Sequence, residues 1–300
     1  MKLSQGFGLT LLVTGGTGFV GQVLVKRLSG QPLRLATRAD LTCWDNVLVG
    51  VATVVHLAAR VHIMHDTDTD PLNAYRAVNV EVTLNLARQA AAAGVKRFVF
   101  ISSVKVNGES TQPGRTFTEA DAPNPKDPYG QSKHEAEKGL RQIAVETCME
   151  VVIIRPPLVY GPGVKANFAS LMRAVQRGWP LPLGAVHNQR SLVALDNLVD
   201  FIITCITHPQ AANQTFLVSD GQDLSITELV RSMAQAAGVP ARLLPVPVWA
   251  LKAGASLLGK SDEVQRLCGN LQVDISKARS LLGWVPAVSV QEALRRAMVV

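Results

Sequence analysis

A tyrosine and a lysine stand four residues apart in the segment Tyr129-Gly-Gln-Ser-Lys133. On a helix this spacing places a phenol and an ammonium group on the same face, one turn apart. A free phenol titrates near about pH 10, so proton exchange near neutrality needs a shift of roughly three pKa units, or about 4 kcal/mol. The ammonium group of Lys133 favours the phenolate. The pair therefore predicts a proton-transfer site, with a solvated helix surface as the alternative.

Three glycines, Gly15, Gly18 and Gly21, come directly after the apolar residues 11–12 and open a helical pattern over residues 19–28. Without a Cβ the chain can turn tightly, a pyrophosphate can approach the helix N-terminus, and the helix can pack closely on the strand. This strand-turn-helix setting is the one that a dinucleotide-binding fingerprint needs; an ordinary glycine turn is the alternative. A nicotinamide ring held here in its cationic form would favour the phenolate further.

The composition is that of a globular protein with a large core, since 47% of the 300 residues are hydrophobic. No apolar run reaches the length of a membrane span, and the N-terminus lacks a leader pattern, so we expect a cytoplasmic protein. The formal charge of +7 comes from dispersed basic residues without an aromatic platform, which argues against nucleic acid. An anionic small substrate, held by a few arginines, explains the charge better.

The cysteines Cys43, Cys148, Cys205 and Cys268 are far apart and show no paired spacing, which predicts reduced thiols rather than disulfides or a metal site. His62 and His65 could share a helix face, but no third ligand stands nearby. We therefore expect no metal.

Short apolar runs alternate with helical patterns up to about residue 156, which predicts an α/β fold with a doubly wound parallel sheet of the Rossmann type. The predicted strands are residues 9–14, 33–37, 53–57, 97–102 and 150–155. The predicted helices are residues 18–29, 71–93 and 129–148. Little room is left between Arg38 and the third strand, so we expect a local deletion after the second strand.

A second part of the chain has a different pattern, with helices predicted over residues 167–177, 196–208, 225–237 and 291–297 between Pro/Gly turns. We therefore divide the chain into a dinucleotide-binding domain, residues 1–156, to which later segments return, and a smaller C-terminal α/β substrate lobe, mainly residues 157–300. Residues 246–258 could form a helix at a membrane surface, but we expect them to pack against the lobe.

Several motifs occur in a fixed order from residue 13 to residue 286. Beside the glycine turn and the Tyr129/Lys133 pair they are Val55-His-Leu-Ala-Ala59, Val78-Asn-Val80, Ile154-Arg-Pro156, Tyr160-Gly-Pro162 and Asp274-Ile-Ser-Lys277 with Leu282-Gly-Trp284. With them the chain resembles an extended short-chain dehydrogenase/reductase, most closely the NAD-dependent epimerase/dehydratase family that acts on nucleotide sugars.

The resemblance implies specific site residues. The catalytic residues would be Ser103, Tyr129 and Lys133. The cofactor would contact Gly15, Thr17, Gly18, Phe19, Val20, Gly21, Arg38, Leu57, Ala58, Ala59, Asn79, Tyr129 and Lys133. The substrate would contact Ser103, Asn167 and Arg190, the last as a diphosphate ligand.

Alternatives remain for four of these residues. Ser103 would hydrogen-bond the reacting oxygen, or it caps the end of its strand. Asn79 braces a helix or relays a proton through water. Arg38, at the end of the second strand, suits the 2′-phosphate of NADP(H), which we favour, although NAD(H) with a solvated arginine is the alternative. Arg190 could be a plain surface residue.

The chain departs from the family pattern at positions that bear on the reaction. Dehydratases carry an Asp-Glu pair directly after the catalytic Ser/Thr, and here those positions are Val104 and Lys105, which cannot perform carboxylate chemistry. Leu158 replaces a customary asparagine that contacts substrate, and Val82 stands where a glycine is usual. Dehydration is thereby disfavoured.

We therefore expect an oxidoreductase that acts at C4 of a nucleotide-linked hexose. The first hypothesis is NADPH-dependent reduction of a UDP-4-keto-6-deoxy-N-acetylhexosamine for surface polysaccharide. The alternative is a UDP-glucose or UDP-GlcNAc 4-epimerase with bound NAD. A reductase of non-sugar ketones and a non-catalytic regulator that senses dinucleotide are further rivals. The resemblance also implies a homodimer formed through residues 71–93 and 129–148.

Overall fold

The computed structural model describes residues 9–36, 44–61, 70–257, 259 and 261–298. Six parallel strands form one sheet in the order β2-β1-β3-β4-β5-β8. They are β1 (Thr10–Thr14), β2 (Leu33–Ala36), β3 (Val51–His56), β4 (Arg97–Ile101), β5 (Glu150–Arg155) and β8 (Thr215–Leu217). The order reverses between β1 and β3, and the carboxyl ends of such a pair are where open α/β sheets bind ligands. The predicted α/β fold with a parallel sheet is confirmed.

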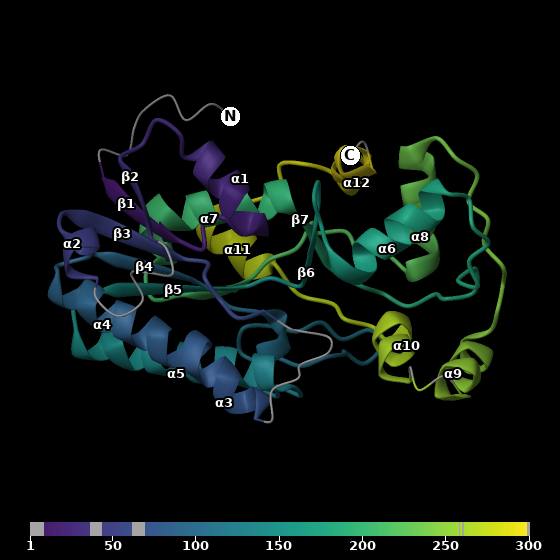
Figure 1. Cartoon of the computed structure of the whole chain (residues 1–300), viewed down its shortest axis with the longest axis horizontal. Helices are drawn as coiled ribbons and strands as arrows, with labels where there is room; N and C mark the ends of the chain where they lie inside the picture. The colour runs from purple at the N-terminus through teal and green to yellow at the C-terminus, as the bar shows by residue number, and fades with distance from the viewer. Residues whose placement is uncertain (1–8, 37–43, 62–69, 258, 260, 299–300) are drawn as a thin grey trace.

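Helices cover both faces of the sheet (Figure 1). On one face lie α1 (Phe19–Arg27), α7 (Leu195–Thr207) and α11 (Ser276–Leu282), and on the other lie α2 (Asp45–Leu48), α4 (Thr83–Ala92) and α5 (Pro128–Glu146). Because both faces are covered, the residues between the charged ends of β4 and β5 are apolar, and both strands are almost entirely buried.

β2 lies at an edge of the sheet within the described residues, and the positions after it, 37–43, on which the predicted deletion falls, lie outside the described ranges. β2 pairs only with β1 within the described residues, and the four-residue helix α2 leads almost directly into β3. Trp44, just before α2, is buried and packs into the core between the sheet and α4.

The helix predicted over residues 71–93 is interrupted. It consists of α3 (Pro71–Arg76), a π-helical turn (Ala77–Val82) and α4. A π turn widens the helix by one residue per turn, and such turns are frequent at functional sites. No residue type in this segment predicts the π turn.

The second part of the chain, for which we predict substrate binding and which we call the substrate lobe, has a separate hydrophobic cluster. It is built from α6 (Ala166–Gln176), α8 (Ile226–Ala237), α12 (Val290–Met298) and the parallel pair β6 (Leu158–Tyr160) and β7 (Leu192–Ala194). The pair α9 (Val248–Leu257) and α10 (Ser261–Cys268) lies at the far end of this lobe (Figure 1). Short 3-10 turns, Val104–Val106 after β4 and Pro209–Ala211 after α7, complete the elements.

Arg97 fixes α7 on the sheet. Its Nη1 donates to the carbonyl oxygens of Cys205, Ile206 and His208, at 2.9, 3.0 and 2.9 Å, which are among the free acceptors at the end of the helix. Glu150 on the neighbouring strand pairs with the same guanidinium at 2.6 Å. The first residue of β4 therefore anchors α7 on the face of the sheet that it covers.

The glycine turn allows a closer approach of helix and loop than any side chain permits. A Cβ on Gly21 would lie 2.1 Å from the Gly15 carbonyl oxygen. We expect Gly21→Ala to lower the free energy of unfolding by about 1–3 kcal/mol, because the loop must shift. Gly254→Ala in α9 is the matched control: its Cβ meets nothing within 4 Å, so it should stabilise by about 0.5–1 kcal/mol. Urea denaturation of both variants measures the difference, and equal effects would contradict the close packing.

Candidate active site

The loop after β1 and the loop after β3 meet at the point where the strand order reverses. Gly15 has a φ of +71°, and a Cβ there would lie 2.7 Å from the backbone nitrogen of Ala58. Thr14 accepts from Leu57 N with its carbonyl and from Ala58 N with its Oγ1, at 3.2 and 3.3 Å. The predicted cofactor residues of both loops are thus brought together.

The first turn of α1 suits an anionic group. Gly18 is its N-cap and offers no side-chain cap, and the first turn contains no acidic residue. Phe19 and Val20 begin the helix, partly packed against the core, while Thr17 is exposed beside it. The N–H groups of this turn are therefore not satisfied by a cap, as a pyrophosphate site requires.

Tyr129 and Lys133 lie on α5, whose start is fixed by Asp127. The Asp127 side chain accepts from Gly130 N at 2.7 Å, and Pro128 occupies the first helical position. A Cβ on Gly130 would lie 2.9 Å from the Lys105 carbonyl oxygen. The beginning of α5 is thus held against the turn that follows β4.

Lys133 is buried and reaches the carboxyl end of β4. Its Nζ donates to Ile101 O at 2.8 Å and lies 4.5 Å from the centre of the Phe100 ring. Burial lowers the pKa of Lys133 to about 7, and the negative charge of Glu137 opposes that shift. The amine therefore titrates near neutrality.

The pKa of Tyr129 is shifted in the direction opposite to the one that its predicted role requires. Burial raises the pKa of its phenol above the ordinary value, and Asp127 and Tyr75 raise it further. The Tyr75 ring meets Tyr129 edge-on with 6.0 Å between ring centres. Lys133 is expected to supply only part of the shift toward the phenolate, and a cationic nicotinamide the rest; the causes that act on the phenol here all raise its pKa.

Ser103 lies two residues beyond Ile101 and caps the short turn after β4. Its Oγ accepts from Lys105 N at 3.2 Å. This bond occupies a lone pair of the hydroxyl and leaves its proton free to be donated. Both predicted roles are therefore compatible, and Ser103 stands at the same sheet edge as Lys133.

Sequence reasoning missed a buried polar network beneath these residues. The Glu137 carboxylate, one turn after Lys133, accepts from Ser102 Oγ at 2.6 Å and from Arg155 Nε and Nη2 at 2.9 and 2.6 Å. Arg155 also donates to Asn107 Oδ1 at 2.9 Å. The repeat Tyr129, Lys133, Glu137 at intervals of four was the available signal.

The charge of this network is set by mutual pairing. Burial alone would raise the pKa of Glu137, but the hydrogen bond and charge of Arg155 outweigh it, so the pKa lies below its usual value. Glu137 therefore stays ionised at neutral pH and faces Lys133 as a carboxylate.

Asn79 braces the site. Within the π turn its Nδ2 donates to Arg60 O and Ser132 Oγ, both at 3.0 Å, and its Oδ1 accepts from Arg60 N at 2.8 Å. Ser132 in turn donates to the Tyr129 carbonyl at 2.8 Å. These bonds favour the bracing role over a proton relay.

His56, from the motif after β3, is buried and structural. Thr14 and Thr83 hydroxyls contact its two ring nitrogens at 2.7 and 2.9 Å. Burial, with the Lys133 charge adding to it, lowers the pKa of His56 to about 3, so the ring stays neutral.

Arg190 lies in the substrate lobe rather than on an open surface. Its Nη1 donates to Arg266 O and Gly269 O at 2.6 and 3.0 Å, at the end of α10. Burial lowers its pKa, and the charge of Glu109 opposes this. Asn167 is exposed in the first turn of α6. Neither residue has a described contact with Tyr129 or Lys133.

Some expectations fall on residues 37–43 and 62–69, which lie outside the described ranges. Arg38, Cys43, His62 and His65 are among them. The three described cysteines are free. Among the described residues, no group of three or more His, Cys, Asp or Glu side chains could hold a metal ion. No described helix is long and apolar enough to cross a membrane.

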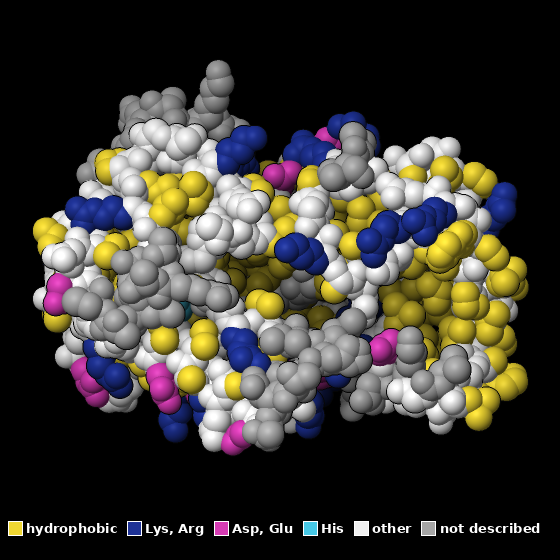
Figure 2. Space-filling view, in the orientation of Figure 1, with side chains coloured by type: hydrophobic (Ala, Val, Ile, Leu, Met, Phe, Trp, Pro, Cys, Tyr) yellow, Lys and Arg dark blue, Asp and Glu magenta, His cyan; other side chains and the backbone are white. Residues whose placement is uncertain are grey.

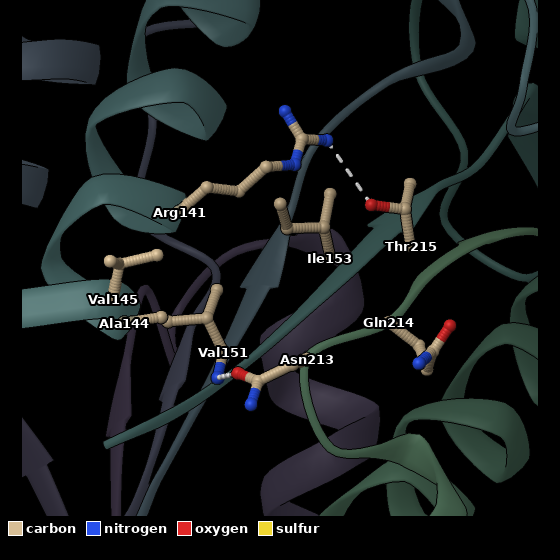
Figure 3. A pocket seen from close by; sticks show the side chains of 8 residues that line it. All are labelled: Arg141, Ala144, Val145, Val151, Ile153, Asn213, Gln214 and Thr215. Atoms are coloured by element: carbon tan, nitrogen blue, oxygen red, sulfur yellow. Dashed lines mark hydrogen bonds between the residues drawn. The ribbon is translucent and has the colours of Figure 1, made fainter. Parts of the chain in front are cut away.

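A pocket away from the site lies beside β5 and β8 (Figure 3). Arg141 lines it and donates from Nη2 to Thr215 Oγ1 at 3.1 Å and to the buried Glu137 at 2.9 Å. This arginine connects the pocket with the network beneath Lys133. None of the predicted catalytic residues lines this pocket.

Comparisons with known proteins agree with this geometry. A model of the NAD dependent epimerase/dehydratase family matches residues 11–219. The chain belongs to this family. It is thus an NAD(P)-dependent enzyme, as predicted.

Individual relatives match nearly the whole chain. A UDP-glucose 4-epimerase of Vibrio cholerae is 52% identical over 96% of this chain and 94% of its own length. An N-acetyl-alpha-D-glucosaminyl-diphospho-ditrans,octacis-undecaprenol 4-epimerase of Escherichia coli O157:H7 is 28% identical over 96% and 94%. The structure of a UDP-glucuronic acid 4-epimerase from Bacillus cereus in complex with NAD covers 97% of this chain and 98% of its own, with a TM-score of 0.78 and 21% identity, and shows the same fold.

The buried network makes a prediction about stability. We expect Glu137→Gln to lower the free energy of unfolding by about 3–5 kcal/mol, because an amide leaves Arg155 buried without its counter-charge. Chemical denaturation at neutral pH measures this loss. Glu292→Gln on α12 is the control: its carboxylate also holds two arginines, but in solvent, so the change should be small. Similar losses in both variants would contradict the importance of burial.

Proposed function

We propose that this protein is a UDP-sugar 4-epimerase that works with bound NAD. The observation that carries the proposal is the 52% identity with the Vibrio cholerae UDP-glucose 4-epimerase over nearly the full length of both chains. The candidate site supports it, because Ser103, Tyr129 and Lys133 converge on the carboxyl ends of the sheet where the glycine turn also lies.

The residues present fit a dinucleotide. Gly15 and Gly18 leave the backbone of the turn open, and the first turn of α1 has neither a cap nor an acidic side chain. The loop at Leu57 and Ala58 would border the bound dinucleotide. When bound, the nicotinamide supplies a reversible two-electron exchange with the sugar carbon.

Each site residue has a role in this reaction. The Ser103 hydroxyl would hold the C4 oxygen, Tyr129 would take its proton and later return it, and Lys133 would favour the phenolate. At C4, the sugar would lose the hydroxyl proton to Tyr129 and the carbon-bound hydrogen, with its electron pair, to the nicotinamide that the site would hold. The 4-keto sugar would then regain the hydrogen on the opposite face of C4 and the proton on its oxygen. The product is an isomer, so no reductant is consumed.

The reductase that the sequence analysis placed first is the second candidate. It depended mainly on Arg38 as a ligand of a 2′-phosphate, and this residue lies outside the described ranges. The Ser103-Val-Lys-Val-Asn-Gly108 segment is compatible with either reaction. A reductase would consume one reduced cofactor for every sugar, which separates the two functions experimentally.

The first test uses the purified protein and no added cofactor. We expect UDP-glucose and UDP-GlcNAc to be converted toward UDP-galactose and UDP-GalNAc, because an epimerase retains its NAD. Product ratios are measured by chromatography or NMR. Absence of conversion, together with NADPH oxidation that depends on a UDP-4-keto-6-deoxy sugar, would establish the reductase instead.

The second test addresses the phenol. Tyr129→Phe should reduce kcat about 10²–10⁴-fold, because proton transfer at C4 loses its acid and base. Tyr75→Phe is the matched control, since it removes a phenol hydroxyl from the neighbouring ring and should retain most activity. Circular dichroism and thermal melting check that both variants fold. Full activity of Tyr129→Phe would remove this residue from the mechanism.

A further inference from the structure

The helix α9 presents large apolar side chains to solvent. Trp249 is 74% exposed and Leu257 is 89% exposed. Trp249 and the exposed Lys252, three residues apart, share one side of the helix, and Leu257 is its last residue. Val248 and Leu251 pack against the core of the lobe. The segment therefore packs against the lobe, as predicted, and also leaves large apolar side chains exposed to solvent.

The apolar exposure continues beyond the helix. Leu244, in the segment that leads into α9, is 50% exposed, and Trp179 is 55% exposed with the Arg177 guanidinium 5.4 Å from the centre of its ring. The two segments lie side by side, because Leu181 N donates to Arg242 O and Leu244 N donates to Leu181 O, both at 2.8 Å. Hydrophobic side chains gather at this end of the molecule, between the positions of α8 and α9 (Figure 2).

The segment that leads into α9 and α9 itself carry only basic charged side chains, while the neighbouring helix α10 carries the exposed Glu263. Residues 239–261 contain the basic residues Arg242, Lys252 and Lys260 and no aspartate or glutamate; the first carboxylates that follow are at positions 262 and 263. A contact between two copies of this face would place Lys252 and Arg242 opposite like charges without an acidic partner from the segment. An anionic surface is complementary instead.

We propose that the α9 surface, formed by Trp179, Arg242, Leu244, Trp249, Lys252 and Leu257, docks the protein on an anionic lipid bilayer. Tryptophan rings favour the headgroup boundary, aliphatic side chains enter the acyl edge, and basic side chains pair with lipid phosphates. The helix has ten residues, about half of what a span needs, so the contact is peripheral.

The position of this surface leaves the candidate site free. α9 lies at the end of the substrate lobe that is remote from the sheet, whereas Tyr129 and Lys133 lie at the sheet edge (Figure 1). Docking is thus independent of the proposed reaction and goes beyond it. A failure of one leaves the other standing.

Vesicle sedimentation tests the proposal with the full chain. We expect the protein to sediment with vesicles that contain phosphatidylglycerol but not with pure phosphatidylcholine vesicles. The fraction bound should fall when salt is raised from about 0.1 M to about 1 M, because the Debye length shrinks from about 10 Å to about 3 Å. The double variant Trp249→Ser/Leu257→Ser should bind at least about tenfold more weakly.

Val145→Ser is the matched control. Val145 is 82% exposed on α5, so its loss removes an exposed apolar side chain elsewhere, and binding should be unchanged. No sedimentation with phosphatidylglycerol vesicles, or equal binding by the double variant, would overturn the proposal. A dimer in analytical ultracentrifugation that is lost in the double variant would also overturn the proposal, because the surface would then bind a second copy of the chain.

Discussion

The candidate site depends on the Glu137 carboxylate, because this group holds α5 against the ends of β4 and β5. It is held on α5, accepts from Ser102 after β4, and pairs with Arg155 at the end of β5. A carboxylate removed from water costs several kcal/mol unless its lone pairs are filled. Here four donors fill them, with Arg141 as the fourth. The same face of α5 that bears this charge carries Lys133 and Tyr129, one and two turns earlier.

Burial also explains why Lys133 and Tyr129 titrate in opposite directions. Desolvation disfavours a charge of either sign, so the pKa of the amine falls and that of the phenol rises, and both groups move toward their neutral forms. Neither shift comes from a direct ion pair between the two. The protonation of the phenol therefore depends on the next charge brought into the same low-dielectric space, and a cationic ring has the sign that favours a phenolate.

Local chemistry decided which features could be predicted. The glycine turn, the buried strands and the helix carrying Tyr129 and Lys133 have signals within a few residues, and their bounds agree within one or two positions. The strands β6, β7 and β8 have three residues each, which is too short for a recognisable hydrophobic pattern in the sequence, and they were not predicted. The π turn around Asn79 depends on its contact with α5. The pairing of Glu137 with Arg155 joins residues 18 apart. Neither feature could be predicted before the three-dimensional arrangement of these elements was known.

Lys105 shows how one position can exclude one reaction and support another. It occupies the place of a dehydratase carboxylate, and its Nζ pairs with Glu109 at 2.9 Å and with Asp127. Asp127 caps α5 and is one of the charges that raise the pKa of Tyr129. A cation beside Asp127 offsets that effect, whereas a glutamate in its place would add a second negative charge near the phenol. Positions 104 and 105 together thus lack the carboxylates that the resemblance assigns to a dehydratase, and the ammonium group of Lys105 partly neutralises the carboxylate of Asp127 at the start of α5.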